Sequence, residues 1–266
     1  MFQSRARRAH ELPGSDPCPP VLYPFSGGGS PLSGLGFETL APAIDSAVQY
    51  TAWIVDRLQP FLGPKVLECG LGHANYRAHY RGVTRYTGVD VDPAVVENAR
   101  RRWPGDEFVC LDLCDPAFAE RVGGGFDAAL CLNVLQYVAD ERRAIEHLLG
   151  AVRVGGHVGL LLPAHGWLLG PMDRLSKQSR RYDLPRLERL IPHVIAEAVV
   201  LDYMNPLGAL SWLASNLMPP RGLTDPAAER RIAFYDRYVV PLSRRLDPLT
   251  RRRFGLSLLC VLRRRR

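Results

Sequence analysis

The residues best suited to chemistry lie in one short stretch, in which Glu68 is followed by Gly70, Gly72 and Asn75. The apolar run that contains Glu68 is typical of a buried parallel strand, and glycine allows a sharp turn and a close approach to a ligand. A dinucleotide site requires a third glycine where this chain has Asn75. A carboxylate two residues before the first glycine suits a ligand that carries positive charge. The alternative is a tight turn that binds nothing.

Two further carboxylates follow apolar runs of strand length. Asp90 lies twenty residues after Gly70, where nucleotide-binding folds place the acid that accepts the ribose hydroxyls. Asp112 ends another run, and its carboxylate, with the Leu113 amide, can bind an adenine ring. The alternatives are a helix cap for Asp90 and a turn for Asp112. We assign the cap instead to Asp92, before the proline of the next helix.

Five strand-like runs alternate with helical patterns, which predicts a parallel sheet covered on both faces. The runs are 65–69, 86–92, 108–113, 126–133 and 154–165. The acids named above, together with Asn133 and His165, lie at the carboxyl ends of these runs and therefore share the edge of the sheet where ligands bind. Two later runs, 194–203 and 254–262, predict strands six and seven. The aromatic residues between them recur at helical spacing and either cap an acceptor site or pack on the body.

The remaining sequence bounds the organisation of the chain. Residues 1–41 are rich in proline and glycine and are expected to form an arm, and 42–266 are expected to form one domain with a helical insert at 205–249. The 266 residues suffice for one sizeable core. No apolar stretch is long enough to cross a membrane, and the basic N-terminus has no apolar run after it, so we expect a cytoplasmic protein.

Charge and cysteine content argue against two other classes of protein. The net charge is +7, yet only two of the 34 basic residues are lysine, and the arginine runs lack the interleaved aromatics that stack on bases. We attribute the arginine excess to genomic base composition and do not expect a nucleic-acid partner. The six cysteines contain no C-x-x-C pair and fall mainly in apolar runs, so we expect reduced core residues and no metal.

The motifs together resemble class I S-adenosylmethionine (SAM)-dependent methyltransferases, over about residues 45–262. The resemblance is to a bacterial group with E-x-G-x-G-x-G-N, L-N-V-L-E-H, P-A-H, R-R-Y and F-G-x-S-L-L motifs, found here at 68–75, 132–138, 162–165, 173–182 and 254–259. It implies a Rossmann-like, doubly wound α/β sheet of seven strands, mostly parallel, with an antiparallel last strand. It also implies SAM as the cofactor, held by Glu68, Gly70, Gly72, Asn75, Asp90, Val91, Asp112, Leu113 and Asn133.

The sequence departs from this pattern at three places. Ala74 replaces the third glycine, Gln136-Tyr137 stands where Glu-His is usual, and Lys177-Gln178 occupies a Gly-His position. Any acceptor chemistry assigned to that missing histidine cannot be transferred to this chain.

The resemblance implies methyl transfer to an oxygen or nitrogen of a small molecule by in-line displacement, which mainly requires correct positioning. His165 is the candidate base, because imidazole titrates near neutral pH; a loop histidine bonded to backbone is the alternative. Tyr182, with Arg180 and Arg181, is the candidate site for an anionic or phenolic acceptor, and a solvated helix start is the alternative. A non-catalytic partner subunit and an arginine-rich nucleic-acid methyltransferase are the competing functions.

Overall fold

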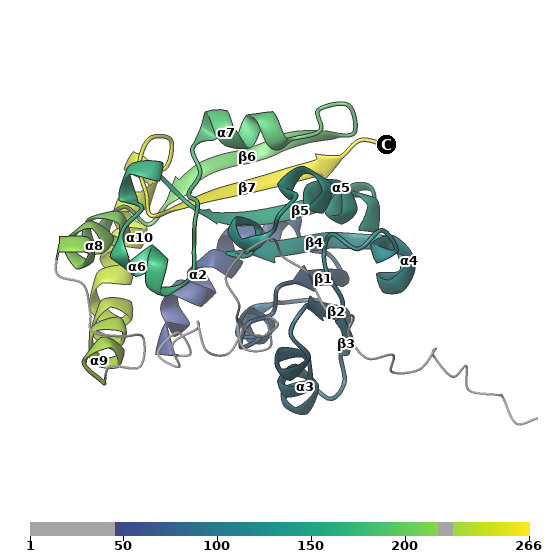
Figure 1. The fold of residues 1–266 in the computed structure, drawn as a ribbon, viewed down its shortest axis with the longest axis horizontal. Helices are drawn as coiled ribbons and strands as arrows, with labels where there is room; N and C mark the ends of the chain where they lie inside the picture. The colour runs from purple at the N-terminus through teal and green to yellow at the C-terminus, as the bar shows by residue number, and fades with distance from the viewer. Residues whose placement is uncertain (1–45, 218–225) are drawn as a thin grey trace, which may run out of the picture.

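The computed structural model describes residues 46–217 and 226–266, so the expected arm over 1–41 lies outside the described part. The described residues form a sheet with helices on both faces (Figure 1). Its strands are β1 (Lys65–Cys69), β2 (Arg85–Asp90), β3 (Glu107–Cys110), β4 (Phe126–Leu132), β5 (Val152–Pro163), β6 (Ala196–Met204) and β7 (Ser257–Arg264).

The order of the strands is β3-β2-β1-β4-β5-β7-β6. Neighbouring strands from β3 to β5 are parallel, and β7 runs antiparallel to both β5 and β6. The predicted seven-stranded, mostly parallel, Rossmann-like sheet with an antiparallel last strand is confirmed. The carboxyl ends of β1, β2, β4 and β5 therefore lie at one edge, and the start of β7 meets them there because β7 runs in the opposite direction.

Helices cover the two faces of the sheet. The α-helices are α2 (Val48–Leu58), α3 (Pro93–Arg102), α4 (Phe118–Val122), α5 (Glu141–Ala151), α6 (Pro171–Leu175), α7 (Leu184–Leu190), α8 (Pro206–Leu217), α9 (Pro226–Phe234) and α10 (Val240–Thr250). Among the described residues they are joined by the 3₁₀ turns η2 (Gln59–Phe61), η3 (Tyr76–His79), η4 (Leu135–Tyr137) and η5 (Gly166–Leu168) and by the π-helix η6 (Tyr235–Val239). The predicted insert is helical, with α8, α9, η6 and α10 in its described part.

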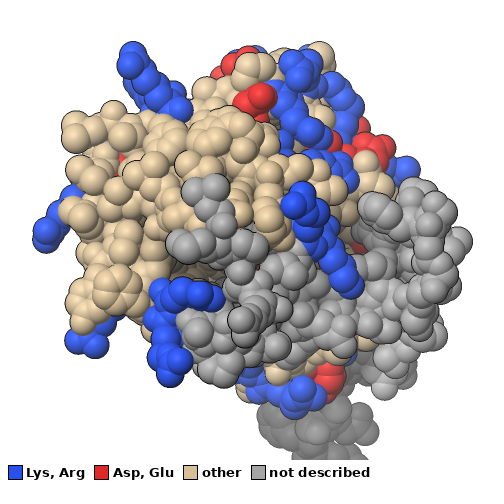
Figure 2. Space-filling model, turned by 60° about the vertical axis from the view of Figure 1, so that its left-hand side comes forward, with Lys and Arg blue, Asp and Glu red and all other residues tan. Residues whose placement is uncertain are grey.

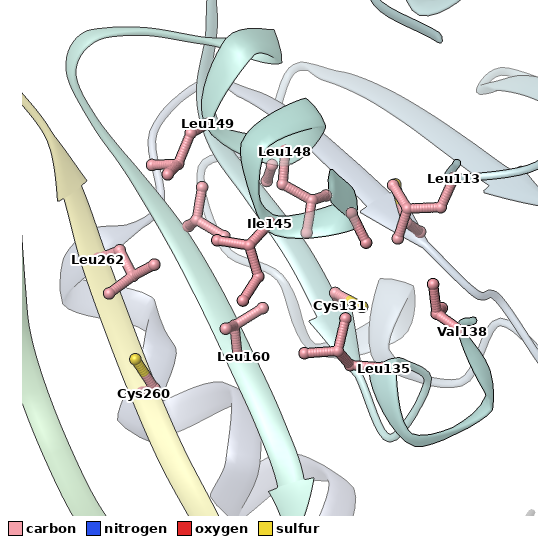
Figure 3. Packing of buried hydrophobic residues seen from close by; sticks show 14 of the residues in the cluster. Leu113, Cys131, Leu135, Val138, Ile145, Leu148, Leu149, Leu160, Cys260 and Leu262 are labelled. Carbon is pink, nitrogen blue, oxygen red and sulfur yellow. The ribbon is translucent and has the colours of Figure 1, made fainter. Parts of the chain in front are cut away.

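Each face of the sheet has its own hydrophobic core. On the α5 face, Leu148 and Leu149 lie about one helical turn after Ile145, and the three side chains pack with Leu160 and Cys131 of the sheet (Figure 3). All five side chains are fully buried, and each large one contributes about 1.5–3 kcal/mol through its removal from water.

The other core lies beneath α2 and α3. Trp53, Ile54 and Leu58 of α2 pack against the sheet, where Leu130 and Leu161 are buried with them. We refer to this side as the α2 face. The side chain of a residue on β1 or β2 faces one core or the other, which decides which side chains can meet at the ligand-binding edge.

The insert is attached to α2 by a carboxylate. The Asp236 side chain accepts hydrogen bonds from the backbone N–H groups of Gln49 and Tyr50, both at 2.9 Å, in the first turn of α2. These N–H groups have no partner within their own helix, so a carboxylate supplied from η6 stabilises the start of the helix. The insert is therefore bound to the helix that leads into β1.

Two further expectations concern metals and thiols. Cys69, Cys114, Cys131 and Cys260 are free thiols, but Cys110 is disulfide-bonded, so the expectation that every cysteine is reduced is wrong. Within residues 46–217 and 226–266 no cluster of metal-ligating side chains is found. No helix in the same residues is long and apolar enough to cross a membrane.

Candidate functional site

The glycine turn after β1 can be made only by glycine at its first position. Gly70 has φ +82°, and a Cβ atom there would lie 2.0 Å from a methyl group of Val134. Its N–H donates to the Val89 carbonyl at 2.7 Å, which extends the β1–β2 pairing into the turn. Gly72 (φ +51°) and Ala74 (φ +54°) continue in the left-handed region. The backbone therefore turns sharply at the edge where ligands bind.

Asp90 lies at the end of β2 and faces this turn. Its Oδ2 accepts the Leu71 N–H at 2.8 Å and its Oδ1 accepts the Asp92 N–H at 2.9 Å. Burial raises the pKa of Asp90, although these backbone hydrogen bonds act to lower it. A carboxylate has about four acceptor sites, and the Gly72 N–H acts on it as well, so Asp90 retains capacity for a ribose hydroxyl. The helix-cap alternative is wrong, because Asp92 caps α3 by accepting from the Ala94 N–H.

Glu68 is fully buried on the α2 face with one carboxylate oxygen satisfied and one not. Oε2 accepts the hydroxyls of Tyr80 at 2.7 Å and Tyr86 at 2.9 Å, whereas Oε1 is buried without a partner. Burial raises the pKa of Glu68 to about 7, against the lowering effect of the two tyrosines and the positive charge of Arg77. An unsatisfied buried carboxylate oxygen beside the turn fits a ligand that brings a cationic group.

Asn75 and Asn133 flank the turn in different ways. The Asn75 side-chain oxygen accepts a hydrogen bond from Arg102 at 2.8 Å, so its amide is held toward α3. Asn133 follows β4 with φ +56°, and its N–H donates to the Leu161 carbonyl at 2.8 Å. The Asn133 side chain also hydrogen-bonds the Tyr76 phenol, which places a polar pair at the edge between β1 and β4.

The predicted adenine-binding residues lie in a turn. β3 ends at Cys110, earlier than expected, and the Sγ of that residue contacts the Val91 carbonyl at 3.6 Å. The Asp112 carboxylate accepts the Cys114 N–H at 2.8 Å, which is the turn arrangement considered as its alternative. The Leu113 carbonyl accepts from His147 at 2.7 Å when its Nδ1 is protonated. Adenine binding by Asp112 and Leu113 stays a prediction.

His165 follows β5 with φ +58° and is held in an aromatic stack. Its ring lies 4.6 Å from that of Tyr203, with an angle of 13° between the planes, and 5.7 Å from that of Phe254. Nε2 is buried without a partner, and burial, followed by the charge of Arg181, lowers the pKa of His165. Tyr203 belongs to the core on the α5 face, so the stack draws His165 toward that face, whereas Glu68 lies on the other. Its role as a base stays a prediction.

Tyr182 is also directed to the α5 face. Its side chain is fully buried, and its hydroxyl donates to Glu141 at 2.5 Å. Arg180 and Arg186 pair with the same carboxylate. The Tyr182 phenol is therefore engaged within the protein by a residue of α5, and its role at an acceptor site stays a prediction.

Arg181 is likewise committed to the protein. It forms a buried ion pair with Asp173 at 2.8 Å and donates to the Ala164 carbonyl at 2.9 Å. Gln178 donates to the Asp173 carboxylate at 2.6 Å, and the Trp212 indole N–H donates to the other oxygen of that carboxylate at 3.3 Å. The R-R-Y motif thus joins β5 to the insert, and an anion would have to displace these bonds to reach Arg181.

Sequence reasoning missed the two tyrosines that bind Glu68. Tyr86 could have been found, because it lies in β2 one residue from Thr87, the pairing partner of Leu67, and alternation then directs it to the Glu68 side. Tyr80 gives no such signal, since it lies in the loop after η3 and meets Glu68 only through the tertiary fold.

Comparison with known proteins agrees with this geometry. Residues 67–158 match a family model described as a methyltransferase domain. A trans-aconitate 2-methyltransferase from Rhizobium rhizogenes is 26% identical over 236 residues, which cover 80% of this chain and 88% of that protein. A ubiquinone biosynthesis O-methyltransferase from Pseudomonas putida is 32% identical over 110 residues, which cover 40% of this chain and 47% of that protein.

Solved structures share the fold. A chain of the complex between the Haloferax volcanii Trm112 methyltransferase activator and a methyltransferase matches with a TM-score of 0.54 and 17% identity, over 84% of this chain and 94% of that chain. The [4+2]-cyclase SpnF matches with a TM-score of 0.51 and 19% identity, over 81% of this chain and 80% of that chain. Because one of these is a cyclase, the fold by itself does not decide the reaction.

Proposed function

We propose that this chain, a SAM-dependent methyltransferase, transfers the methyl group to an oxygen or nitrogen atom of a small molecule. Two of its relatives are methyltransferases whose names refer to a small molecule, trans-aconitate in one case and ubiquinone in the other. The names support a small-molecule acceptor for this chain, and neither of them identifies it.

The observation that carries the proposal is the pair of acids at the glycine turn. Glu68 has a buried oxygen without a partner, and Asp90 retains acceptor capacity after bonding the backbone N–H groups of the turn. A ligand with a cationic end and a vicinal diol fits the two acids, and SAM has both features. Gly70 is required for the turn that brings the two acids together, because the space that a Cβ would need is already filled by Val134.

The protein's task in this reaction is binding and positioning. SAM supplies a methyl group on a sulfonium, which is a good leaving group and needs no covalent help from the enzyme. Glu68 with the Gly70 turn would bind the methionine end, Asp90 the ribose, and Asp112 with Leu113 the adenine. Asn133, at the end of β4, would complete the cofactor site. Correct alignment of two reactants contributes about 7–11 kcal/mol to such a displacement.

The distribution of basic side chains on the surface argues against nucleic acid as the methyl acceptor. On the face drawn in Figure 2, the lysine and arginine side chains stand at separate places around a broad uncharged area. Many arginines are also paired within the protein, for example Arg57 with Asp202 and Arg77 with Asp106. Binding to a phosphate backbone favours a continuous basic stripe instead.

The proposal is tested by incubating the purified protein with SAM and a panel of small phenols, amines and carboxylates, and by measuring release of S-adenosylhomocysteine. We expect release with at least one class of acceptor, and a parallel assay with RNA and DNA should show none. Cofactor binding without release for any acceptor would favour a non-catalytic partner subunit. Release only with nucleic acid would contradict the small-molecule assignment.

A further inference from the structure

A group of hydroxyl and amide side chains lies between the sheet and the insert and is not used by the proposed cofactor site. We call it the hydroxyl cluster, and it consists of Tyr50, Asn205, Tyr235, Ser243 and Ser257. The Tyr50 and Ser257 hydroxyls are 3.0 Å apart. The hydroxyls of Tyr235 and Ser243 donate to the Asn205 side-chain oxygen at 2.7 and 2.8 Å. Three parts of the fold, α2, the sheet edge and the insert, therefore meet in one polar group.

The strand pairing places this cluster at the ligand-binding edge. Ser257 begins β7 and pairs with both Pro163, at the end of β5, and Met204, at the end of β6. Asn205 follows Met204 directly. Tyr50 and Tyr235 pack against the core on the α2 face, which is the face that holds Glu68. The cluster and the glycine turn thus share both an edge and a face of the sheet.

Asn205 is held in a conformation that few residues adopt. Its φ is +69°, in the left-handed region that asparagine tolerates better than most residues. Its Oδ1 also accepts the Gly208 N–H at 3.0 Å, which fixes which end of the amide is the oxygen. The Nδ2 group is consequently the donor end; it is buried, no well-formed hydrogen bond satisfies it, and the Tyr50 phenol is the neighbouring group with which it interacts. An unsatisfied buried donor is costly unless a ligand or water satisfies it.

Tyr76 connects the cluster to the cofactor turn. Burial raises the pKa of Tyr76, and the proximity of Tyr50 and then of Glu68 raises it further. Tyr76 and Tyr50 pack against the same core on the α2 face, so the Tyr76 phenol interacts with Tyr50 of the cluster and Glu68 of the turn, and it hydrogen-bonds Asn133. A molecule bound beside the cluster would be adjacent to the expected position of the methyl donor.

The charged groups that act on these phenols are acidic. Burial raises the pKa of Tyr235, and the proximity of Tyr50 and then of Asp236 adds to the rise. Burial also raises the pKa of Tyr50, against hydrogen bonds from Ser257 and Asn205 that lower it, and Asp247 adds to the rise. Arg57 is the cation that pairs with Asp247, at 2.8 Å, and it also binds Asp202 at 2.6 Å. Its charge is therefore already balanced by two carboxylates. Such surroundings disfavour a ligand that brings further negative charge.

We propose that the hydroxyl cluster binds the methyl acceptor, that the Asn205 Nδ2 group donates to an oxygen of it, and that the acceptor is an uncharged hydroxylated molecule rather than a carboxylate. The proposal rests on the proposed function, since it names the acceptor site of the same reaction. The aromatic faces of Tyr50 and Tyr235 suit a flat ring, and their hydroxyls can each donate or accept. The expected preference differs from that of the relative whose named substrate is the tricarboxylate trans-aconitate.

The test uses the full chain saturated with S-adenosylhomocysteine, with catechol and resorcinol as uncharged probes and trans-aconitate as the anionic probe. Ligand-observed NMR should show binding of at least one diphenol and weaker or no binding of trans-aconitate. The substitution Asn205→Asp keeps the oxygen that bonds Gly208 and replaces the Nδ2 donor with an acceptor. It should weaken diphenol binding about tenfold, and Tyr235→Phe should weaken it about threefold. Tyr238→Phe, an exposed tyrosine of the same π-helix, should change nothing.

The affinity of each variant for S-adenosylhomocysteine and its thermal midpoint are measured in the same samples. Unchanged cofactor affinity with weakened diphenol binding supports the acceptor site. Tighter binding of trans-aconitate than of both diphenols, equal diphenol binding by the wild type and Asn205→Asp, or no diphenol binding to a protein that binds the cofactor would overturn it. If Asn205→Asp unfolds, Tyr235→Phe decides in the same way. If the wild type itself does not bind S-adenosylhomocysteine, the result counts against the proposed function instead.

Discussion

The raised pKa of Glu68 makes SAM binding depend on pH in a way that can be calculated. Burial sets this pKa at about 7, and the hydroxyls of Tyr80 and Tyr86 oppose the shift. If only the ionised carboxylate binds the cationic end of SAM, the apparent affinity is proportional to the fraction of protein in which Glu68 is ionised. For a pKa of about 7, the apparent affinity should rise about tenfold between pH 6 and pH 8.

Tyr80→Phe should move this dependence to higher pH. A hydrogen bond to a charged group contributes about 1.5–3 kcal/mol, and 1.36 kcal/mol corresponds to about one pKa unit. Loss of the Tyr80 hydroxyl should therefore raise the Glu68 pKa by about one to two units. At pH 7 the ionised fraction would fall from about one half to a tenth or less, so SAM should bind about five- to fiftyfold more weakly.

The assay is isothermal titration calorimetry with SAM from pH 6 to pH 8.5. Glu68→Gln gives the reference curve, because the amino group of SAM also titrates in this range and its contribution remains in that variant. Tyr238→Phe is the matched control, since its exposed phenol contacts neither Glu68 nor the turn. Superimposable curves for the wild type, Tyr80→Phe and Glu68→Gln would refute the assigned role of Glu68.

The same group should affect stability without any cofactor. In the pH range between its unfolded value of 4.5 and its folded value of about 7, Glu68 holds a proton in the native state and not in the unfolded state. The free energy of unfolding should therefore fall as pH rises through this range, by up to about 3 kcal/mol. Urea unfolding of Glu68→Gln should lack this component, and an unchanged pH profile would show that Glu68 titrates normally.

Four other substitutions test ribose binding, the glycine turn, the attachment of the insert to α2 and the proposed base. Asp90→Ala should weaken SAM binding at least about tenfold in calorimetry, because charged-acceptor bonds to two hydroxyls are lost; unchanged affinity would argue against ribose binding. Gly70→Ala should destabilise the protein by about 2 kcal/mol or more in urea, exceeding Gly82→Ala, which has a similar positive φ in open space and isolates the backbone strain. Asp236→Ala should cost about 1–2 kcal/mol in the same assay, since two N–H groups of α2 lose their acceptor. For His165→Ala, a turnover rate that falls more than cofactor affinity supports the base, whereas a lower thermal midpoint with an unchanged rate indicates that the ring only stacks.

Much of this fold could be predicted from local sequence. Apolar runs bounded by turn residues gave the strands, and the acid before a proline predicted the start of α3 at Asp92. The position of Asp90 at the edge was predictable because parallel strands end together. These features depend on residues that are near one another in the chain.

The directions of side chains that meet through the tertiary fold could not be predicted. His165 and Tyr182 do follow β5, but the Tyr203 ring and the Glu141 carboxylate draw them to the α5 face. The partner of Glu68 in a distant loop, Tyr80, is invisible to periodicity for the same reason. Asn205 carries no sequence signal either, since the direction of its amide is set by three hydrogen bonds that groups of the insert donate to its side-chain oxygen.

The most direct measurement of the central claim is calorimetric titration of the wild-type protein with SAM and with S-adenosylhomocysteine at pH 8. We expect saturable one-to-one binding of both compounds that raises the thermal midpoint and is weakened by Asp90→Ala. A protein that gives no heat and no change in thermal midpoint with either compound would contradict it.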